Sequence, residues 1–216
     1  MKDNNRINLQ HTRCLLIDCD DTLYPSSSGA WEMVRVRINQ FMREEMHFPE
    51  DEINTLRARL FHQYGTTLRG LQIEYSVDSD AYLDYVHDVP LENIIQPNPQ
   101  LAQILSKIPQ RKLVFTNASA DHAQRVLDLL GVATHFEGIV DIYAITPHCK
   151  PEVKAFHSAL AVIDEKPEHC LLVDDSPPNL DTAQSLGMQT ISIGARRHEA
   201  SPHINSIEEL DRVLNL

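Results

Sequence analysis

The hydrophobic positions along the chain are concentrated in five short runs that are rich in Ile, Val and Leu. These runs are "CLLID" (14 to 18), "KLVFTN" (112 to 117), "GIVDIYA" (138 to 144), "CLLVDD" (170 to 175) and "QTISIG" (189 to 194). Short runs with apolar residues at nearly every position are typical of strands buried on both faces of a parallel sheet. The pattern therefore predicts five such strands.

Helical patterns separate most of these runs. "SADHAQRVLDLLG" offers Ser119 as an N-cap and ends at Gly131. "SPPNLDTAQSLG" places Pro177 at the first helical position and ends at Gly187. Because strands and helices alternate, we predict an α/β fold built on a doubly wound parallel sheet.

The long interval between the first and second apolar runs contains helical patterns but no convincing strand. Two amphipathic stripes there are interpreted as helix packing; they consist of Trp31, Val34, Ile38 and Phe41, and of Ile53, Leu56, Leu60 and Tyr64. Pro97 and Pro99 mark the return to the sheet. We predict an α/β core formed by residues 1–24 and 98–216, and an inserted helical unit formed by residues 25–97.

Polar side chains stand where the predicted strands end. They are Asp18 after the first strand, Thr116 and Asn117 after the second, Asp174 and Asp175 after the fourth, and Lys150 at the start of the helix after the third. In open parallel sheets, ligands bind at the carboxyl ends of the strands. Because these residues come from four different strand ends, we expect them to converge on one site.

The charges of these residues indicate their chemistry. Asp18 and Asp175 would repel each other unless a cation lay between them, and oxygen ligands of this kind suit Mg²⁺. In an extended segment Asp20 points to the same side as Asp18, while Asp21 turns away. Two carboxylates in different surroundings can divide the roles of nucleophile and acid.

An anion site is expected beside these carboxylates. Thr116, Asn117 and the free backbone N–H groups that open the next helix form a cradle for an anion, and Lys150 adds a positive charge. A metal, a nucleophile, a proton donor and an anion cradle together indicate phosphoryl transfer.

The amino-acid composition limits the classes of binding partner that we expect. The 19 Lys and Arg against 31 Asp and Glu give a formal net charge of −12, which disfavours polymeric nucleic acid and anionic membranes as partners. The first 13 residues lack the apolar core of a signal peptide, so we expect a cytoplasmic protein. The four cysteines are expected to be free thiols, and the eleven histidines to be surface or core residues, because neither set has a metal-binding spacing.

Four motifs in order resemble those of the haloacid-dehalogenase-like (HAD) hydrolase superfamily, in the branch with a helical cap inserted after the first motif. They are "DCDDT", "FTNAS", "CKP" and "VDDSPPN", and the match runs from residue 14 to about residue 194. The resemblance implies a Rossmann-like core and hydrolysis of small phosphorylated metabolites.

The same resemblance implies a role for each motif residue. Asp18 would attack phosphorus to give an aspartyl-phosphate, and Asp20 would protonate the leaving oxygen and then activate water. Thr116 and Lys150 would bind the phosphoryl group. Asp18, the backbone carbonyl of Asp20, and Asp175 would hold Mg²⁺, with Asp174 and Asn179 supporting them.

Residues 64 to 101 resemble the cap of pyrimidine 5′-nucleotidases, which implies a nucleoside monophosphate as substrate. Arg69 is the candidate reader of a base or sugar, because its guanidinium is a planar fork of donors, although a solvated helix residue explains it equally well. Tyr24 is a candidate to line the pocket or the cap hinge, with packing beneath the cap as the alternative.

Three other functions fit parts of the pattern. A phosphoacceptor receiver domain also combines Asp, Thr and Lys-Pro around Mg²⁺, but in it the lysine comes last, whereas Lys150 precedes Asp174 here. A dehalogenase has no leaving oxygen and does not need Asp20. A phosphatase or phosphomutase of the same superfamily that acts on sugar phosphates or other small phosphorylated metabolites has the same motifs and remains open.

Overall fold

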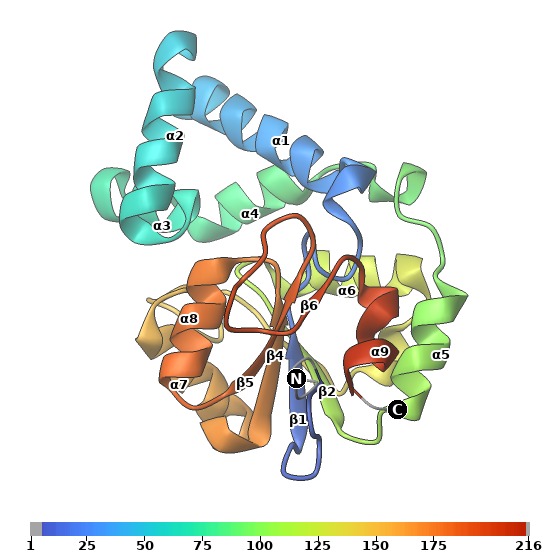
Figure 1. Ribbon diagram of the computed structural model, residues 1–216. Coiled ribbons are helices and arrows are strands. Elements are labelled where there is room, and N and C mark those ends of the chain that lie inside the picture. Colours follow the sequence, from blue (N-terminus) through green and yellow to red (C-terminus); the bar gives the residue numbers. More distant parts are fainter. Residues whose placement is uncertain (1–5, 215–216) are drawn as a thin grey trace.

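The computed structural model describes residues 6–214. Its centre is a parallel sheet with the strand order β3-β2-β1-β4-β5-β6 (Figure 1). The strands are β1 (Cys14–Ile17), β2 (Arg111–Phe115), β3 (Gly138–Val140), β4 (Cys170–Asp174), β5 (Gln189–Ile193) and β6 (His203–Ile204). The predicted α/β fold with a doubly wound parallel sheet is thus confirmed. Residues 1–5 and 215–216 of the predicted core lie outside the described residues.

Two strands depart from the prediction. The third apolar run forms a strand only over Gly138–Val140, because the carboxylate of Asp141 accepts hydrogen bonds from the backbone N–H groups of Ala120 and Ala144, each at 3.0 Å, and turns the chain out of the sheet. The short strand β6 was not predicted. It extends the sheet by pairing with β5.

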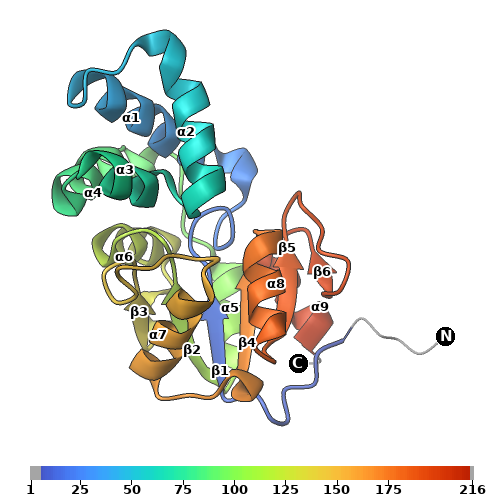
Figure 2. The same ribbon diagram turned by 90° about the vertical axis from the view of Figure 1, so that its left-hand side faces the viewer.

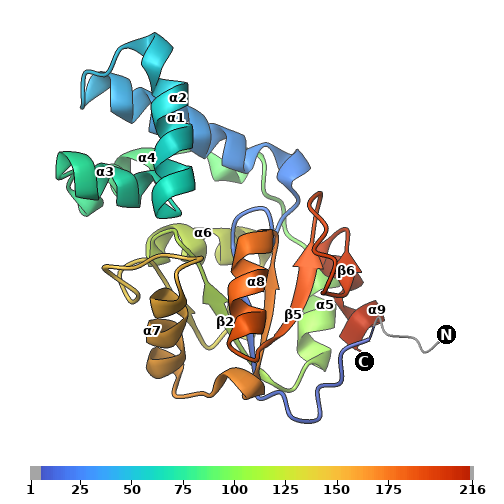
Figure 3. The same ribbon diagram turned by 60° about the vertical axis from the view of Figure 1, so that its left-hand side comes forward.

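Helices cover both faces of the sheet. They are α5 (Pro99–Lys107), α6 (Ala120–Leu130), α7 (Val153–Ile163), α8 (Pro177–Ser185) and α9 (Leu210–Leu214). Leu15 and Ile17 of β1 share one hydrophobic cluster with α5, α6 and α9, while Leu16 shares another with α7 and α8. Figure 3 shows α7 and α8 on the near side of the sheet, with α5 and α9 beyond it. The uniform apolarity of the strands therefore reflects burial on both faces.

The predicted helix ends are confirmed for α6. Its N-cap is Ser119, whose hydroxyl accepts a hydrogen bond from the backbone N–H of His122, and Gly131 ends it in the left-handed region with φ of 72°. Helix α8 begins at Pro177, as predicted.

The insertion after β1 consists of four helices, α1 (Ala30–Glu44), α2 (Glu50–Tyr64), α3 (Thr67–Tyr75) and α4 (Ser79–His87), which we call the cap. Figure 1 shows the cap above the ends of the strands, on the side where the chain leaves β1. Gly70 lets α3 approach α2 closely, since a Cβ atom there would lie 2.7 Å from Leu60. One detail of the predicted packing is wrong: Trp31 is 38% exposed, and Ala30 is buried at the start of α1 instead.

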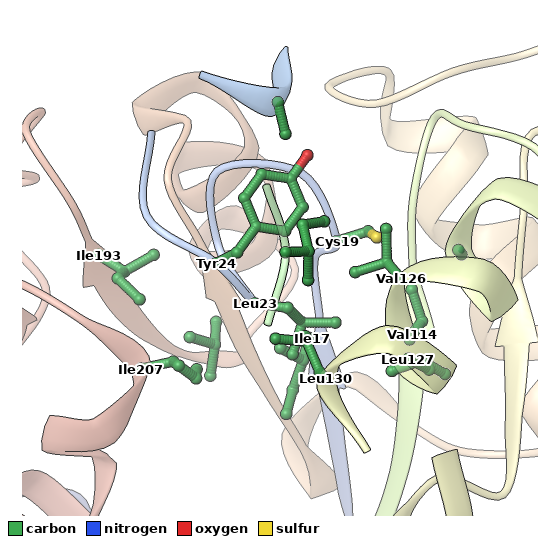
Figure 4. Close-up of a cluster of buried hydrophobic side chains, with 14 of the residues drawn as sticks. Ile17, Cys19, Leu23, Tyr24, Val114, Val126, Leu127, Leu130, Ile193 and Ile207 are labelled. Atoms are coloured by element: carbon green, nitrogen blue, oxygen red, sulfur yellow. The ribbon is translucent and has the colours of Figure 1, made fainter. Parts of the chain in front are cut away.

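The segment that joins β1 to the cap is fixed by hydrophobic contacts. Leu23 and Tyr24 are buried in the cluster that also contains Ile17 of β1 and Val126 of α6 (Figure 4). In Figure 4 the hydroxyl of Tyr24 points away from this cluster. The four cysteines are free and buried, as expected. Within residues 6–214, every helix is too short or too polar to cross a membrane.

Candidate active site

The candidate residues meet where β1 lies between β2 and β4. The register pairs Ile17 with Val114 of β2 and with Val173 of β4, so the next residues along each strand reach the same edge of the sheet. The backbone N–H of Asp18 donates to the carbonyl of Val173 at 2.9 Å and holds Asp18 at this edge. This is the topological switch point of the sheet, because the chain passes from β1 to β2 on one side of β1 and later crosses from β3 to β4 on the other side.

Lys150 lies at the centre of the site and contacts several of its residues. Its Nζ atom donates to Asp18 Oδ1 at 2.8 Å, to Asp174 Oδ2 at 2.9 Å and to the carbonyl of Phe115 at 2.7 Å. Burial acts to lower the pKa of Lys150, but the two carboxylates raise it overall. The lysine is therefore a buried cation. It lies just before α7 rather than at the start of that helix as predicted.

Asp174 orients this lysine. Its carboxylate is fully buried, and besides Lys150 it accepts hydrogen bonds from Asn179 at 2.9 and 3.0 Å and from the backbone N–H of Ser176 at 2.9 Å. With so many donors, the Asp174 carboxylate is committed to holding Lys150 rather than free to bind a ligand.

An acidic cluster surrounds the lysine. Carboxylate oxygens of Asp18, Asp174 and Asp175 all lie within 4.8 Å of one another. Burial raises the pKa of Asp18 well above its usual range; Lys150 opposes this rise, and Asp174 and Asp175 add to it. Burial and the charge of Asp174 also raise the pKa of Asp175. The site thus carries more negative charge than Lys150 balances, and a cation beside Asp18 and Asp175 would relieve it.

Arg196 also contributes charge to this cluster. Its guanidinium donates to Asp175 Oδ2 at 2.7 Å from the loop after β5. The sequence analysis missed it because an isolated arginine in a loop has no distinguishing pattern.

Asp20 has a different environment from Asp18. Its Oδ1 atom accepts a hydrogen bond from Tyr24 at 2.5 Å and another from His122 Nε2 at 2.8 Å. Burial acts to raise the pKa of Asp20, but the interactions with His122, Tyr24 and His87 lower it to about 2. The two carboxylates on this strand end therefore have different surroundings and opposite pKa shifts, so they can take different chemical roles.

Thr116 and Asn117 are placed differently within the predicted anion cradle. Thr116 accepts a hydrogen bond from the backbone N–H of Ala118 at 3.0 Å, which leaves its own hydroxyl hydrogen for an anion. The side chain of Asn117 exchanges two hydrogen bonds with the backbone of Lys150, at 2.8 and 3.0 Å. The amide of Asn117 therefore holds the loop that carries Lys150 in place.

Arg69 and Tyr24 were candidates for contact with substrate, with a solvated helix residue and packing beneath the cap as the alternatives. Arg69, in α3, lines a small cavity with Tyr143 and His148 of the loop that precedes Lys150. Its guanidinium makes no hydrogen bond or ion pair among the described residues, and its charge acts to lower the pKa of Cys149, which burial raises to about 11. Tyr24 is 3% exposed and its hydroxyl donates to Asp20, so it faces the Asp20 carboxylate rather than an open pocket.

The cap contacts the loop that carries Cys149 and Lys150. The backbone carbonyl of Tyr64 accepts from the Cys149 thiol at 3.2 Å. A Cβ atom on the next residue, Gly65, would lie 3.1 Å from the carbonyl oxygen of Lys150, and the φ of Gly65 is 85°. Only glycine fits this contact without strain.

Comparison with known proteins identifies the class to which this fold and site belong. The model of the haloacid dehalogenase-like hydrolase family matches residues 12–187, most of the chain. The chain therefore belongs to this family of hydrolases.

The sequence identity to an individual relative is low. Phosphate metabolism protein 8 of Saccharomyces cerevisiae is 28% identical over 193 residues, which cover 82% of this chain and 60% of that protein. The chain thus spans less than two thirds of the length of this curated relative.

Two solved structures share the fold. HAD-hydrolase YfnB from Bacillus subtilis, bound to magnesium, has a TM-score of 0.64 and 19% identity, and the match covers 95% of this chain and 99% of that one. A HAD phosphatase from Thermococcus onnurineus has a TM-score of 0.61 and 17% identity, with 94% and 97% covered.

Proposed function

We propose that the protein is a magnesium-dependent phosphomonoester hydrolase that works through an aspartyl-phosphate on Asp18. The observation that carries this proposal is the contrast between Asp18, which lies beside Lys150 in an acidic cluster, and Asp20, whose carboxylate is held by Tyr24 and His122. A single carboxylate would serve a dehalogenase, whereas an alcohol leaving group needs a second group to supply its proton.

The first step forms the intermediate. A carboxylate oxygen of Asp18 attacks phosphorus, the bond from phosphorus to the ester oxygen breaks, and a proton from Asp20 goes to the leaving oxygen. The pKa of Asp20 is about 2 in the resting arrangement. The negative charge of a phosphate placed beside it raises this pKa, so substrate binding favours the protonated acid that the step requires.

The second step removes the phosphoryl group. Asp20, now ionised, takes a proton from a water molecule that attacks phosphorus. The bond between phosphorus and Asp18 breaks, inorganic phosphate leaves, and both aspartates return to their starting states. Lys150 and Thr116 stabilise the charge on the phosphoryl oxygens through both steps.

Magnesium fits the acidic cluster. Asp18 and Asp175 would hold the ion, together with the backbone carbonyl of Asp20 that the family resemblance implies. Burial and, after it, the charges of neighbouring carboxylates raise the pKa values of Asp18 and Asp175, and a bound cation would favour their ionised forms. When bound, Mg²⁺ supplies charge neutralisation for the phosphoryl group.

For the substrate we propose a pyrimidine nucleoside 5′-monophosphate. The resemblance of residues 64 to 101 to nucleotidase caps supports this choice, and so does the guanidinium of Arg69, which is unpaired among the described residues and lies beside the loop that carries Lys150. The cap would then read the nucleoside while the core holds the phosphate.

A phosphate-release screen over nucleotides, sugar phosphates and p-nitrophenyl phosphate tests both levels of the proposal. We expect Mg²⁺-dependent release that is fastest with UMP and CMP. Trapping with hydroxylamine and mass spectrometry should place the acyl phosphate on Asp18. A label on Asp174 or Asp175 would overturn the mechanism, and equal rates for all esters would overturn the nucleotide assignment alone.

A further inference from the structure

Both hydrogen bonds to the Asp20 carboxylate reach the same oxygen. Tyr24 Oη donates to Oδ1 at 2.5 Å and His122 Nε2 contacts the same atom at 2.8 Å. Among the described residues, no hydrogen bond reaches Oδ2. One oxygen of this carboxylate is therefore anchored by two donors, while the other is left to meet a substrate.

The ring of His122 is held in one orientation. It comes from the first turn of α6, and its side chain is fully buried. An ionised carboxylate only accepts hydrogen bonds, so the hydrogen that His122 shares with Asp20 is assigned to Nε2. The other ring nitrogen, Nδ1, is buried without a hydrogen-bond partner among the described residues. The position of the ring is thus fixed by Asp20 and by packing.

The packing partner comes from the cap. The ring of His87, the last residue of α4, stacks on His122 with 4.1 Å between ring centroids and 22° between planes. Figure 2 shows the α3 and α4 end of the cap above α6. His87 Nδ1 lies 3.1 Å from the hydroxyl of Ser119, the N-cap of α6, and Arg125 of α6 donates to the carbonyl of Val89 at 2.7 Å. Several contacts therefore fasten the end of α4 to α6.

Burial and the neighbouring His122 together lower the pKa of His87 to about 3, although Asp20 acts to raise it. The stacked ring is uncharged at neutral pH. The ring of His87 shields one face of His122 from water, and this strengthens the hydrogen bond between His122 and Asp20.

We propose that His122 is a positioning residue that turns Oδ2 of Asp20 toward the reacting phosphoryl group, and that His87 makes this alignment depend on the seating of the cap. The proposal rests on the proposed function, because it assigns an orientation to the group that handles protons there. Only with α4 seated on α6 is the proton-handling carboxylate fully aligned.

Two substitutions at His122 test the first part. His122→Phe keeps a flat ring against His87 but removes the donor, whereas His122→Gln keeps an N–H donor. We expect His122→Phe to lower kcat for the best alkyl phosphate by roughly 10 to 10²-fold, less than complete loss of acid–base catalysis. KM should stay within about threefold because ground-state binding is unaffected, and His122→Gln should recover most of kcat.

The leaving group adds a second readout. p-Nitrophenolate leaves readily without a proton, so His122→Phe should lose less with p-nitrophenyl phosphate than with the alkyl ester. Equal losses on both esters, a change in KM alone, or no recovery in His122→Gln would overturn the positioning role. Thermal unfolding of each variant identifies any loss that comes from misfolding.

A double-mutant cycle tests the link to the cap. His87→Ala should lower kcat in the wild-type background and have little further effect when combined with His122→Phe, since both act through Asp20. Asp80→Ala, which removes the 2.7 Å hydrogen bond between the cap and Tyr143, is the matched control and should combine additively with His122→Phe. Additive losses for His87→Ala would overturn the coupling.

NMR separates this inference from the proposed function. In protein labelled with ¹⁵N in its histidines, His122 should show a hydrogen on Nε2, and the Nε2 resonance should shift in Asp20→Asn. This holds whether or not the wild type releases phosphate from any ester. A hydrogen on Nδ1 alone would overturn the inference, and a protein that shows the Nε2 hydrogen but no phosphatase activity would overturn the proposed function instead.

Discussion

The Nζ atom of Lys150 lies 2.8 Å from Oδ1 of Asp18, although the two residues are 132 positions apart in the chain. This contact joins the first motif of the chain to the third. It places a permanent positive charge beside the proposed nucleophile and beside the phosphoryl group that would bond to it. The charge of Lys150 balances the buried carboxylates in the fold, and in the proposed reaction it would also stabilise the phosphoryl group.

Lys150→Met should abolish phosphate release and also destabilise the protein. The substitution leaves the buried carboxylates of Asp18 and Asp174 without their cation, and breaking a buried pair in this way costs about 3 to 5 kcal/mol. Urea denaturation without added metal measures the loss. Adding Asp174→Asn to Lys150→Met should restore part of the stability, and unchanged stability in the single variant would contradict the view that Lys150 balances the cluster.

Asp18→Asn and Asp20→Asn should impair different steps of the proposed reaction. Asp18→Asn removes the nucleophile and nearly all activity, whereas Asp20→Asn keeps its backbone carbonyl and loses only proton transfer, which costs roughly 10² to 10⁴ in rate. Rapid-quench measurement with labelled substrate should find no adduct in the first variant. Near-normal turnover in either variant would reject the role assigned to that residue.

Removal of magnesium should stop turnover and lower stability. Mg²⁺ bound beside Asp18 and Asp175 relieves their repulsion, so it should raise the melting temperature of the wild type. Asp175→Asn should weaken the affinity for Mg²⁺ by roughly tenfold or more, since even partners that only orient metal ligands contribute 10- to 100-fold. Calorimetric titration with Mg²⁺ measures this directly, and phosphate release that survives excess EDTA would contradict the metal assignment.

Arg69→Ala should remove the preference for nucleotides. Loss of a direct contact to the base or sugar costs about 1 to 3 kcal/mol in kcat/KM for UMP. Hydrolysis of p-nitrophenyl phosphate, which lacks those groups, should stay nearly constant. Arg59→Ala is a matched control, because Arg59 pairs with Glu74 within the cap at the surface. Equal losses on both substrates would mean that Arg69 supports the cap instead.

Acid should destabilise the fold through His87. Its pKa is lowered from about 6.5 in an unfolded chain to about 3 in the folded protein, with burial as the main cause. The unfolded chain binds a proton between these values and the folded protein does not, so stability falls as the pH drops from 6.5 toward 3. His87→Phe should lose less stability over this range in denaturation measured at several pH values. A parallel loss in both proteins would contradict the assignment.

Much of the fold could be predicted because burial on both faces leaves a strong mark in sequence. β1 and β4 read as uninterrupted apolar runs, and the polar residues that follow them meet at one edge of the sheet. Strand β6 has two residues, too few to produce any pattern. Trp31 follows the helical period of α1, but the period alone does not set where the buried face ends.

The motif residues were predictable, but their hydrogen-bond partners were not. Asp18 and Asp174 lie at strand ends and Lys150 lies shortly before a helix, and such positions in a parallel sheet are typical of ligand sites. His87, His122 and Arg196 are single residues on a helix end, a helix start and a loop, and their contact with the site depends on how distant segments fold together. Asn117 was predicted for the right place, yet the use of its amide to hold Lys150 follows only from the geometry.

The glycine at position 65 has a consequence for redesign. Because its backbone lies against the loop of Lys150, any helical insertion grafted in place of the present one must present a similarly bare stretch of chain at that point. Grafts that keep this footprint should dock and leave the chemistry intact while changing which molecules are admitted. Grafts that place a side chain there should push the lysine out of line and inactivate the enzyme, whatever pocket they carry.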